Sequence, residues 1–482
     1  MKQKKNIADI LSIWGSQFGA VVIAFVTQLI LARILNISEY GAFMTAFNTA
    51  MLLGGIACFG AGPNWLRLIG KEGWNGLRWI KVNILLLVIT TGIMVIGYLL
   101  MIPLTSTSNM TMIISFCFLS VMIARSFSTP AEAVYQLEEN YVKLSVVKFM
   151  NHGLKFLVVL ICVGLSLSLS AIVVGYLITS ILMLVWYIFL LMRAVKHRIH
   201  LVGHGEYNFN TIEKPSLKEA FFLLLPYGST TVFYLIYFQG PIYLVNVLTG
   251  DENAAIYNVI FTVLNVLFLF PVTLYQSYLI PKIHRWTGSN INKIDLLTKV
   301  GSKISLLIGI AIGIPITILA PSAVEMAFGE EYRSAGIYIA LLAIIVPLRL
   351  VSNNIGSVLV TEQFIKKKAI YQFYAAVLSV TLNLILLSFI GLKGAVFTLI
   401  AAESVVTILF LYCLFRHVKI RIQKSAYYLF VYILFVIGTI SFYNAKSIVD
   451  DILGIFIYSL LSIIIYIVIR NDKELKGLFR KT

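Results

Sequence analysis

Charged residues are scarce in this 482-residue chain. Asp, Glu, Lys and Arg together make up only 12% of the residues, whereas soluble globular proteins carry about 25%. With 59% of its residues apolar, the chain can be neither a water-soluble globular protein nor a disordered one. One bilayer-spanning helix needs about 20 apolar residues, so roughly 284 apolar residues could supply about fourteen such helices. The composition therefore predicts an all-α polytopic membrane protein.

Cysteines are few, and the common catalytic motifs are missing. The four cysteines, Cys58, Cys117, Cys162 and Cys413, lie in apolar runs without CxxC spacing, which excludes a disulfide-stapled fold. The sequence contains neither the glycine-rich loop that binds nucleotide phosphates nor the HExxH motif of zinc proteases. We therefore expect no enzyme, no metal site and no cofactor other than a coupling ion.

Apolar runs near twenty residues long divide the chain into fourteen predicted spans. A polar, basic stretch between the sixth and seventh spans is the longest hydrophilic connection. We expect an N-lobe over 1–195, a cytoplasmic linker over 196–216, a C-lobe over 217–418, and two helices with a cytoplasmic tail over 419–482. The predicted spans are 12–35, 40–68, 78–101, 110–137, 141–167, 169–193, 217–248, 254–281, 299–320, 335–361, 369–390, 393–415, 425–443 and 451–470.

Basic residues collect on one predicted side of the membrane. With the N-terminus inside, 31 of the 38 Lys and Arg fall in inner segments, four in outer segments and three within spans. Acidic residues such as Asp251, Glu252 and Glu330 lie in outer connections instead. Because basic residues favour the cytoplasmic side, both termini are expected to be cytoplasmic. The outer connections are short, so no extracellular domain is expected.

The fourth and tenth spans resemble each other, which suggests an internal repeat. When Arg125 is aligned with Arg349 without gaps, Ser128 meets Ser352. Each arginine lies in the fourth span of its lobe, and six spans per lobe give both lobes the same orientation. We therefore expect two six-helix lobes related by a parallel pseudo-twofold axis, followed by two C-terminal helices.

Three basic residues, Arg125, Lys155 and Arg349, are expected near the middle of spans. An Arg or Lys at mid-bilayer costs about 2.5–3.5 kcal/mol or more, so each must face a water-filled cavity or be paired within the bundle. Two acids, Glu132 and Glu403, are also expected inside the membrane, so the three central cations outnumber them. Both interpretations of these cations, cavity lining and structural ion pairing, stay open. A cationic cavity would suit an anionic ligand such as a phosphate or pyrophosphate.

Two further arginines, Arg33 and Arg67, stand at the ends of predicted spans. Basic residues there commonly anchor a helix at the membrane edge, but both are also candidate cavity cations. Glycine and proline interrupt several spans, for example at Gly60 and at Pro347. Such residues permit kinks, which are frequent in the moving helices of transporters.

Several motifs resemble the polysaccharide-export branch, the Wzx-type flippases, of the multidrug/oligosaccharidyl-lipid/polysaccharide exporter superfamily. Residues 31–35 read LARIL and residues 38–41 read SEYG, which together resemble the family's opening motif. Phe59-Gly60 followed by Arg67 resembles its second helix, and residues 391–395, GLKGA, resemble its turn before helix 12. The resemblance covers about residues 10–415.

This resemblance implies a flippase of the bacterial cytoplasmic (inner) membrane. Proteins of the family move undecaprenyl-pyrophosphate-linked oligosaccharide units, such as O-antigen units for lipopolysaccharide, by alternating access around a cationic cavity. By resemblance, Arg125, Arg349 and Lys155 would face the pyrophosphate or acidic sugars, and Arg33 and Arg67 are further candidate substrate-binding cations. The implied partners are the lipid-linked oligosaccharide, membrane lipids, a polysaccharide polymerase and glycosyltransferases, with no nucleic acid.

One departure from the family concerns ion coupling. Members often carry an acid in the first helix of the second lobe, where this chain reads FQGP at residues 238–241. Coupling to H⁺ or Na⁺ would therefore depend on Glu403 or Glu132.

Three alternative functions stay open. A lipid II flippase and a cation-coupled small-molecule antiporter belong to the same superfamily. A polytopic polysaccharide polymerase or ligase belongs to another class, and such enzymes tend to need a large outer loop. The short outer connections of this chain argue against that class.

Overall fold

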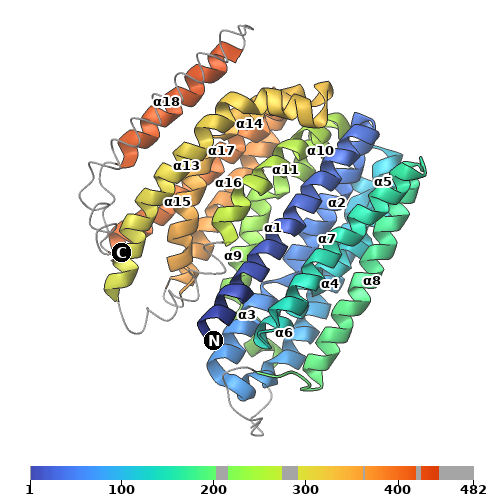
Figure 1. Ribbon diagram of the computed structural model, residues 1–482, viewed down its shortest axis with the longest axis vertical. Coiled ribbons are helices and arrows are strands. Elements are labelled where there is room, and N and C mark those ends of the chain that lie inside the picture. The colour runs from blue at the N-terminus through green and yellow to red at the C-terminus, as the bar shows by residue number, and fades with distance from the viewer. Residues whose placement is uncertain (1, 202–214, 274–290, 362–363, 419–424, 444–482) are drawn as a thin grey trace. The chain divides into compact units, whose positions relative to one another are not determined.

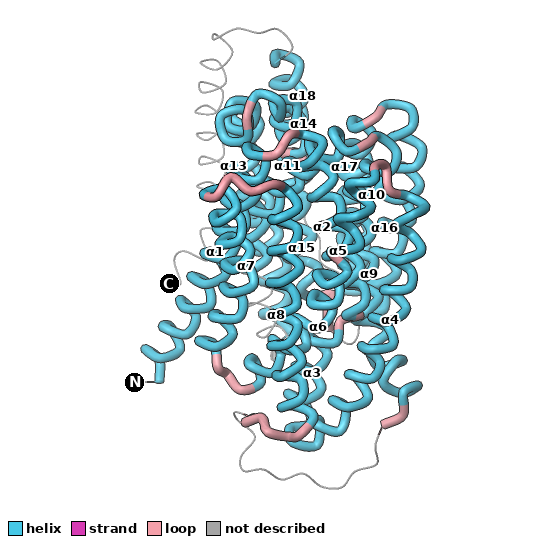
Figure 2. Tube along the Cα trace, turned by 90° about the vertical axis from the view of Figure 1, so that its right-hand side faces the viewer, coloured by secondary structure: helices cyan, strands magenta, loops and turns pink. Residues whose placement is uncertain are grey.

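The structure, a computed structural model, describes residues 2–201, 215–273, 291–361, 364–418 and 425–443. All regular elements in these ranges are helices, and Figure 2 shows no strand among them. The expected all-α fold is confirmed. Contacts divide the chain into two compact units, unit 1 at Met1–Asn258 and unit 2 at Val259–Thr482. The predicted lobes, divided at residues 196–216, and their pseudo-twofold relation stay predictions.

Unit 1 is a helical bundle in which helices distant in sequence pack against each other (Figure 1). Helix α1 (Lys2–Ile34) packs against α7 (Tyr141–Gly164), and α6 (Leu119–Leu137) packs against both α2 (Ile37–Cys58) and α8 (Leu169–Val195). The other helices of this unit are α3 (Ala61–Glu72), η1 (Gly73–Leu77), α4 (Arg78–Thr105), α5 (Asn109–Cys117), α9 (Leu217–Phe238), α10 (Gly240–Thr249) and the first part of α11 (Asp251–Thr273).

Unit 2 begins within α11 and is also a bundle. Helix α13 (Ile291–Phe328) packs against α14 (Arg333–Leu342) and α15 (Ile345–Val358), while α16 (Ile365–Ile390) packs along α17 (Leu392–Cys413). The remaining helices are η3 (Glu330–Tyr332), η4 (Leu414–Val418) and α18 (Ser425–Tyr443), the last of which packs on α13 and α14.

The described helices are suited to a bilayer by length and composition. Among the described residues, seven helical stretches are long and apolar enough to cross a membrane. The number rises to nine if each of two bent pairs of helices is counted as one span. Both counts are below the fourteen spans predicted from the sequence, partly because one stretch, Ile37–Leu104, contains two predicted spans. Thirteen of the fourteen predicted spans overlap described helices, and the last, 451–470, lies outside the described residues.

Helix α8 exposes large apolar side chains along its length. Along its length, Val174, Ile178, Val185 and Phe189 are each more than half exposed. A row of exposed large apolar side chains would be unfavourable in water but matches the hydrocarbon of a bilayer. The chain is therefore a multi-pass membrane protein, and the cytoplasmic location of its termini stays a prediction.

Capping boxes set the start of two helices at positions where spans were predicted to begin. At the start of α2, the Asn36 side chain accepts a hydrogen bond from the Glu39 backbone N–H, and the Glu39 carboxylate accepts one from the Asn36 N–H. Ser216 and Glu219 form the same reciprocal pair at the start of α9. Each box satisfies two backbone donors that the first helical turn leaves without partners.

The predicted span 40–68 is broken in the structure between α2 and α3. Phe59 and Gly60 both adopt left-handed backbone conformations, with φ of 45° and 70°. The Thr90 hydroxyl donates to the carbonyl of Ala57 at 2.7 Å, so one backbone acceptor freed near this break has a partner. Gly60 also meets the backbone of Gly228, which an added Cβ would approach to 3.3 Å.

Two other predicted spans are bent, and each bend comes shortly before an intramembrane arginine. The axis turns by 40° between α5 and α6 and by 54° between α14 and α15. Arg125 lies eight residues after Cys117, the end of α5, and Arg349 lies seven residues after Leu342, the end of α14. This shared geometry supports the internal repeat expected from the sequence.

Candidate functional site

A small cavity in unit 1 brings together two of the predicted cations. Arg125 from α6 and Lys155 from α7 both line it. Polar side chains from the same helices and from α8 complete much of the wall, among them Ser128, Asn151 and Ser180. The cavity therefore combines two positive charges with neutral hydrogen-bonding groups inside a membrane protein.

Arg125 is half-buried, and its orientation is set locally. Its guanidinium Nη1 donates to the Ser128 hydroxyl at 3.1 Å, and that hydroxyl donates in turn to the Arg125 carbonyl at 2.8 Å. Ser128 follows Arg125 by three residues on the same helix, so the two side chains share a face. The serine holds the guanidinium at the cavity without neutralising its charge.

Lys155 is 9% exposed and is surrounded by π faces. Its Nζ donates to Asn151 Oδ1 at 3.3 Å and lies 5.2 Å from the centroid of the Phe47 ring and 6.0 Å from that of Tyr176. Cation–π contact stabilises a partly desolvated ammonium by about 0.5–2 kcal/mol without cancelling its charge. Phe47 and Tyr176 were not identified from the sequence, because aromatic residues in apolar runs carry no distinguishing signal there.

The cavity of unit 1 has no counter-anion among the described residues. No described carboxylate lies within ion-pair distance of Arg125 or Lys155. A buried charge without a partner is costly, and such charges in membrane proteins commonly mark binding sites. The arrangement can bind an anionic group by charge-assisted hydrogen bonds.

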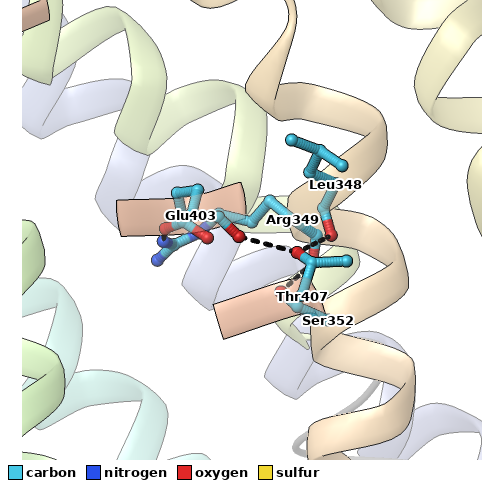
Figure 3. A network of polar contacts seen from close by, with 5 residues as sticks. All are labelled: Leu348, Arg349, Ser352, Glu403 and Thr407. Atoms are coloured by element: carbon cyan, nitrogen blue, oxygen red, sulfur yellow. Dashed lines mark hydrogen bonds and ion pairs between the residues drawn. The ribbon is translucent and has the colours of Figure 1, made fainter. Parts of the chain in front are cut away.

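The central arginine of unit 2, Arg349, has different contacts from those of Arg125. Arg349 on α15 is 3% exposed, and its Nη1 donates to Oε1 of Glu403 on α17, which is fully buried (Figure 3). The guanidinium also lies 5.0 Å from the centroid of the Phe268 ring. The Thr407 hydroxyl donates to the carbonyls of Glu403, at 2.8 Å, and Leu348, at 3.3 Å, and so ties the two helices together (Figure 3). This geometry favours the structural ion pair among the two explanations that the sequence left open for Arg349.

The other predicted site residues do not line the unit 1 cavity. Arg33 is exposed in the last turn of α1. Arg67 is half-buried, donates to Asn64 Oδ1 at 3.1 Å and lies 4.4 Å from the centroid of the Tyr227 ring. Glu132 lies 3.7 Å from Lys148 Nζ in an ion pair. Within the described part of the chain, no group of three or more His, Cys, Asp or Glu could hold a metal ion.

Gly54 allows α2 to approach α6 closely beside Arg125. A Cβ atom at this position would lie 2.5 Å from the Met122 carbonyl oxygen and 2.7 Å from Arg125 Cβ. We expect Gly54→Ala to destabilise the protein by about 1–3 kcal/mol, because the helices must separate. The measurement is the thermal midpoint of the full chain in detergent. Gly97→Ala on α4 is the control, since its Cβ would meet no atom within 4 Å, and equal midpoints for the two variants would contradict the packing argument.

Comparisons with known proteins agree with this membrane fold. The profile of a family described as "Polysaccharide biosynthesis protein" matches residues 7–286. Among curated protein sequences, no relative matches the chain.

Solved transporter structures share the fold. The lipid II flippase MurJ, in an inward closed conformation, superposes with a TM-score of 0.68 at 13% identity, covering 96% of this chain and 100% of MurJ. A mutant of the Vibrio cholerae MATE transporter VcmN gives a TM-score of 0.59 at 14% identity, covering 84% of this chain and 96% of that one. The MATE multidrug transporter DinF-BH gives 0.64 at 15% identity, covering 85% and 94%. The chain therefore belongs to the polysaccharide biosynthesis protein family, and its fold is that of MurJ and the MATE transporters of the MOP superfamily.

Proposed function

We propose that this protein is a flippase that translocates undecaprenyl-pyrophosphate-linked oligosaccharide units across the bacterial cytoplasmic membrane by alternating access. The observation that carries the proposal is the cavity of unit 1, where Arg125 and Lys155 share a wall without a described counter-anion. A diphosphate headgroup supplies the missing negative charge. The family and the transporter fold support movement of a lipid-linked sugar rather than its chemical modification.

In this proposal, Arg125 and Lys155 contact the headgroup while it crosses the low-dielectric interior. Two fixed cations lower the cost of desolvating a diphosphate, which is otherwise the largest barrier to its passage. The neutral donors Ser128 and Ser180 can add hydrogen bonds to phosphate oxygens. Roles for Arg33 and Arg67 in the same passage stay predictions, as do the O-antigen and lipopolysaccharide pathway, the inner-membrane location and the partner enzymes.

Ion coupling is a separate part of the proposal. Glu403 is already paired with Arg349, whereas Glu132 has a side chain 17% exposed beside Lys148. Of the two predicted acids, Glu132 is therefore the more accessible to H⁺ or Na⁺. The dependence of flipping on an imposed H⁺ or Na⁺ gradient, in wild type and in Glu132→Gln, tests this role.

A second candidate function is lipid II flipping. The specific observation in its favour is the similarity to MurJ over 96% of this chain. Lipid II also carries a diphosphate, so the cavity of unit 1 suits both lipids, and the sugar portion must distinguish them.

The test reconstitutes the full chain into proteoliposomes with fluorescently labelled substrates and uses dithionite to quench the label in the outer leaflet. A prenyl-diphosphate-linked trisaccharide and lipid II are compared with ethidium, a small organic cation, and with a labelled phosphatidylcholine that reports leakage. We expect the trisaccharide lipid to flip faster than lipid II. Faster lipid II flipping would favour the second candidate, and ethidium transport without flipping of either lipid would identify an antiporter instead.

A further inference from the structure

A second small cavity in unit 1 is lined by neutral oxygen-bearing side chains from four helices, α2, α4, α5 and α10. They include Thr45 and Thr49 of α2, Thr111 of α5 and Asn246 of α10. Among the described residues, no charged side chain lines this cavity. Its volume of about 20 Å³ gives room for roughly one water molecule, so it cannot hold a sugar or a lipid headgroup.

The two threonines of α2 bring buried hydroxyls without partners to this cavity. Thr45 is 3% exposed and Thr49 is 4% exposed, and neither hydroxyl has a hydrogen-bond partner among the described residues. They lie four residues apart and share a helix face. A buried helical threonine can donate to the carbonyl four residues earlier, as Thr27 does to Ile23 at 2.7 Å. Most buried hydroxyls are paired, so two without partners at one cavity indicate an occupant that contacts both.

Asp251, at the start of α11, orients two of the lining groups. Its Oδ1 accepts hydrogen bonds from the Thr111 hydroxyl at 3.1 Å and from Asn246 Nδ2 at 2.7 Å. The single hydroxyl hydrogen of Thr111 is thereby used, and Ser108, 2.9 Å away, is the donor in its contact with Thr111. Because Asp251 takes hydrogens from these two groups, the capacity they have left is mainly that of oxygen acceptors.

Asp251 also lies against α2. Gly41 comes four residues before Thr45, and a Cβ atom added to it would collide with the backbone of Asp251. The carboxylate is therefore close to the helix that carries both threonines and is bonded directly to two lining residues of α5 and α10. A carboxylate behind neutral oxygen ligands orients them and strengthens their interaction with a cation. The same charge disfavours an anion in the cavity.

We propose that this cavity binds one alkali cation, Na⁺ or K⁺, through neutral oxygens that include those of Thr45 and Thr49, with Asp251 as the counter-charge behind them. Hard cations take oxygen ligands, and Mg²⁺ and Ca²⁺ prefer carboxylates or water in direct contact, for which the cavity offers neither group nor room. The bound ion links α2, α5 and α10. This site is separate from Glu132 and Glu403, since neither lines the cavity, and it does not depend on which lipid is transported.

The test is equilibrium binding of radioactive Na⁺ and, in parallel, of radioactive Rb⁺ as a substitute for K⁺, to the purified full chain in detergent. Choline chloride keeps the ionic strength constant. In the double variant Thr45→Val with Thr49→Val, we expect the affinity of one bound equivalent to fall about tenfold or more, because two oxygen ligands are lost. Thr27→Val is the matched control, since its hydroxyl is paired within its own helix, and it should bind like the wild type.

The charge of Asp251 is tested separately. Asp251→Asn keeps an oxygen that can accept from Thr111 and Asn246 but removes the negative charge, so we expect the cation affinity to fall about tenfold. Glu252, the next residue of α11, is exposed, and Glu252→Gln removes the same charge. Its cation affinity should stay within about twofold of the wild type, because solvent screens an exposed charge.

Stability distinguishes an ion ligand from a structural role of the threonines. In choline chloride, the double valine variant should be at least as stable as the wild type, because valine keeps the shape and removes two unpaired buried hydroxyls. Adding Na⁺ or K⁺ should raise the thermal midpoint of the wild type more than that of this variant, because a ligand stabilises the state that binds it.

Binding of Na⁺ alone, of Rb⁺ alone or of both agrees with the inference and identifies the ion. Cation binding at other places, such as Glu132, appears as equivalents that persist in every variant of this series. The inference is overturned if the wild type binds neither cation, or if the folded double valine and Asp251→Asn variants bind both as the wild type does, which would assign the cavity to a water molecule. Flipping is not measured here, so failure of the proposed function would leave this result unchanged.

Discussion

Replacing Glu403 with glutamine is expected to destabilise unit 2 by about 3–5 kcal/mol, because it leaves the buried guanidinium of Arg349 without its counter-charge. Arg349 is 3% exposed and Glu403 is fully buried, so water cannot replace the lost carboxylate without opening the helices. A positive charge inside a membrane bundle is costly unless it is paired. The thermal midpoint of the full chain in detergent should fall clearly below that of the wild type.

Two controls separate charge pairing from general damage. The double variant Arg349→Met with Glu403→Met removes both charges and keeps similar volume, so we expect stability close to that of the wild type or above it. Glu132→Gln breaks a partly exposed pair at 3.7 Å and should cost only about 0–1 kcal/mol. A Glu403→Gln protein as stable as Glu132→Gln would show that the Arg349–Glu403 pair does not hold α15 to α17.

Removing both cations of the unit 1 cavity should nearly abolish flipping. We expect Arg125→Met with Lys155→Met to lower the flipping rate of a prenyl-diphosphate-linked oligosaccharide by about 100-fold or more. Two charge-assisted hydrogen bonds are worth about 1.5–3 kcal/mol each, and every 1.4 kcal/mol corresponds to about tenfold. Methionine preserves the aliphatic stem, so packing around Phe47 and Tyr176 changes little.

The control for this loss is a lysine outside the cavity. Lys218 is exposed near the start of α9, and Lys218→Met removes one positive charge without touching the cavity. Its flipping rate should stay within about twofold of the wild type. Equal losses in Lys218→Met and in the double cavity variant would indicate that total positive charge, rather than the cavity, controls transport.

Much of the fold can be predicted from a single sequence, because the bilayer restricts the backbone structures that can span it. Apolar runs near twenty residues must become helices, since the hydrocarbon offers no partners for backbone groups. The capping residues Asn36 and Ser216 fix helix starts near the predicted positions. Gly60 marked a break that the structure contains, but the left-handed conformation of Phe59 beside it was not predictable, because bulky residues seldom adopt it.

The candidate site was only partly predictable. The free-energy cost of a charge inside the bilayer identifies Arg125, Lys155 and Arg349 as residues that need a water-filled cavity or a charged partner. It does not show which of the two applies to each residue. The partner of Arg349 lies on another helix, and a single sequence does not report which faces of two helices meet.

We propose that an anionic lipid headgroup crosses the membrane in contact with Arg125 and Lys155 of unit 1 and not with Arg349. The direct measurement is the flipping rate of a labelled prenyl-diphosphate-linked oligosaccharide in proteoliposomes that contain equal amounts of folded Arg125→Met/Lys155→Met or Arg349→Met/Glu403→Met protein. We expect flipping to be lost in the first variant and retained in the second. Flipping retained in the first variant and lost in the second would show that the headgroup does not depend on Arg125 and Lys155.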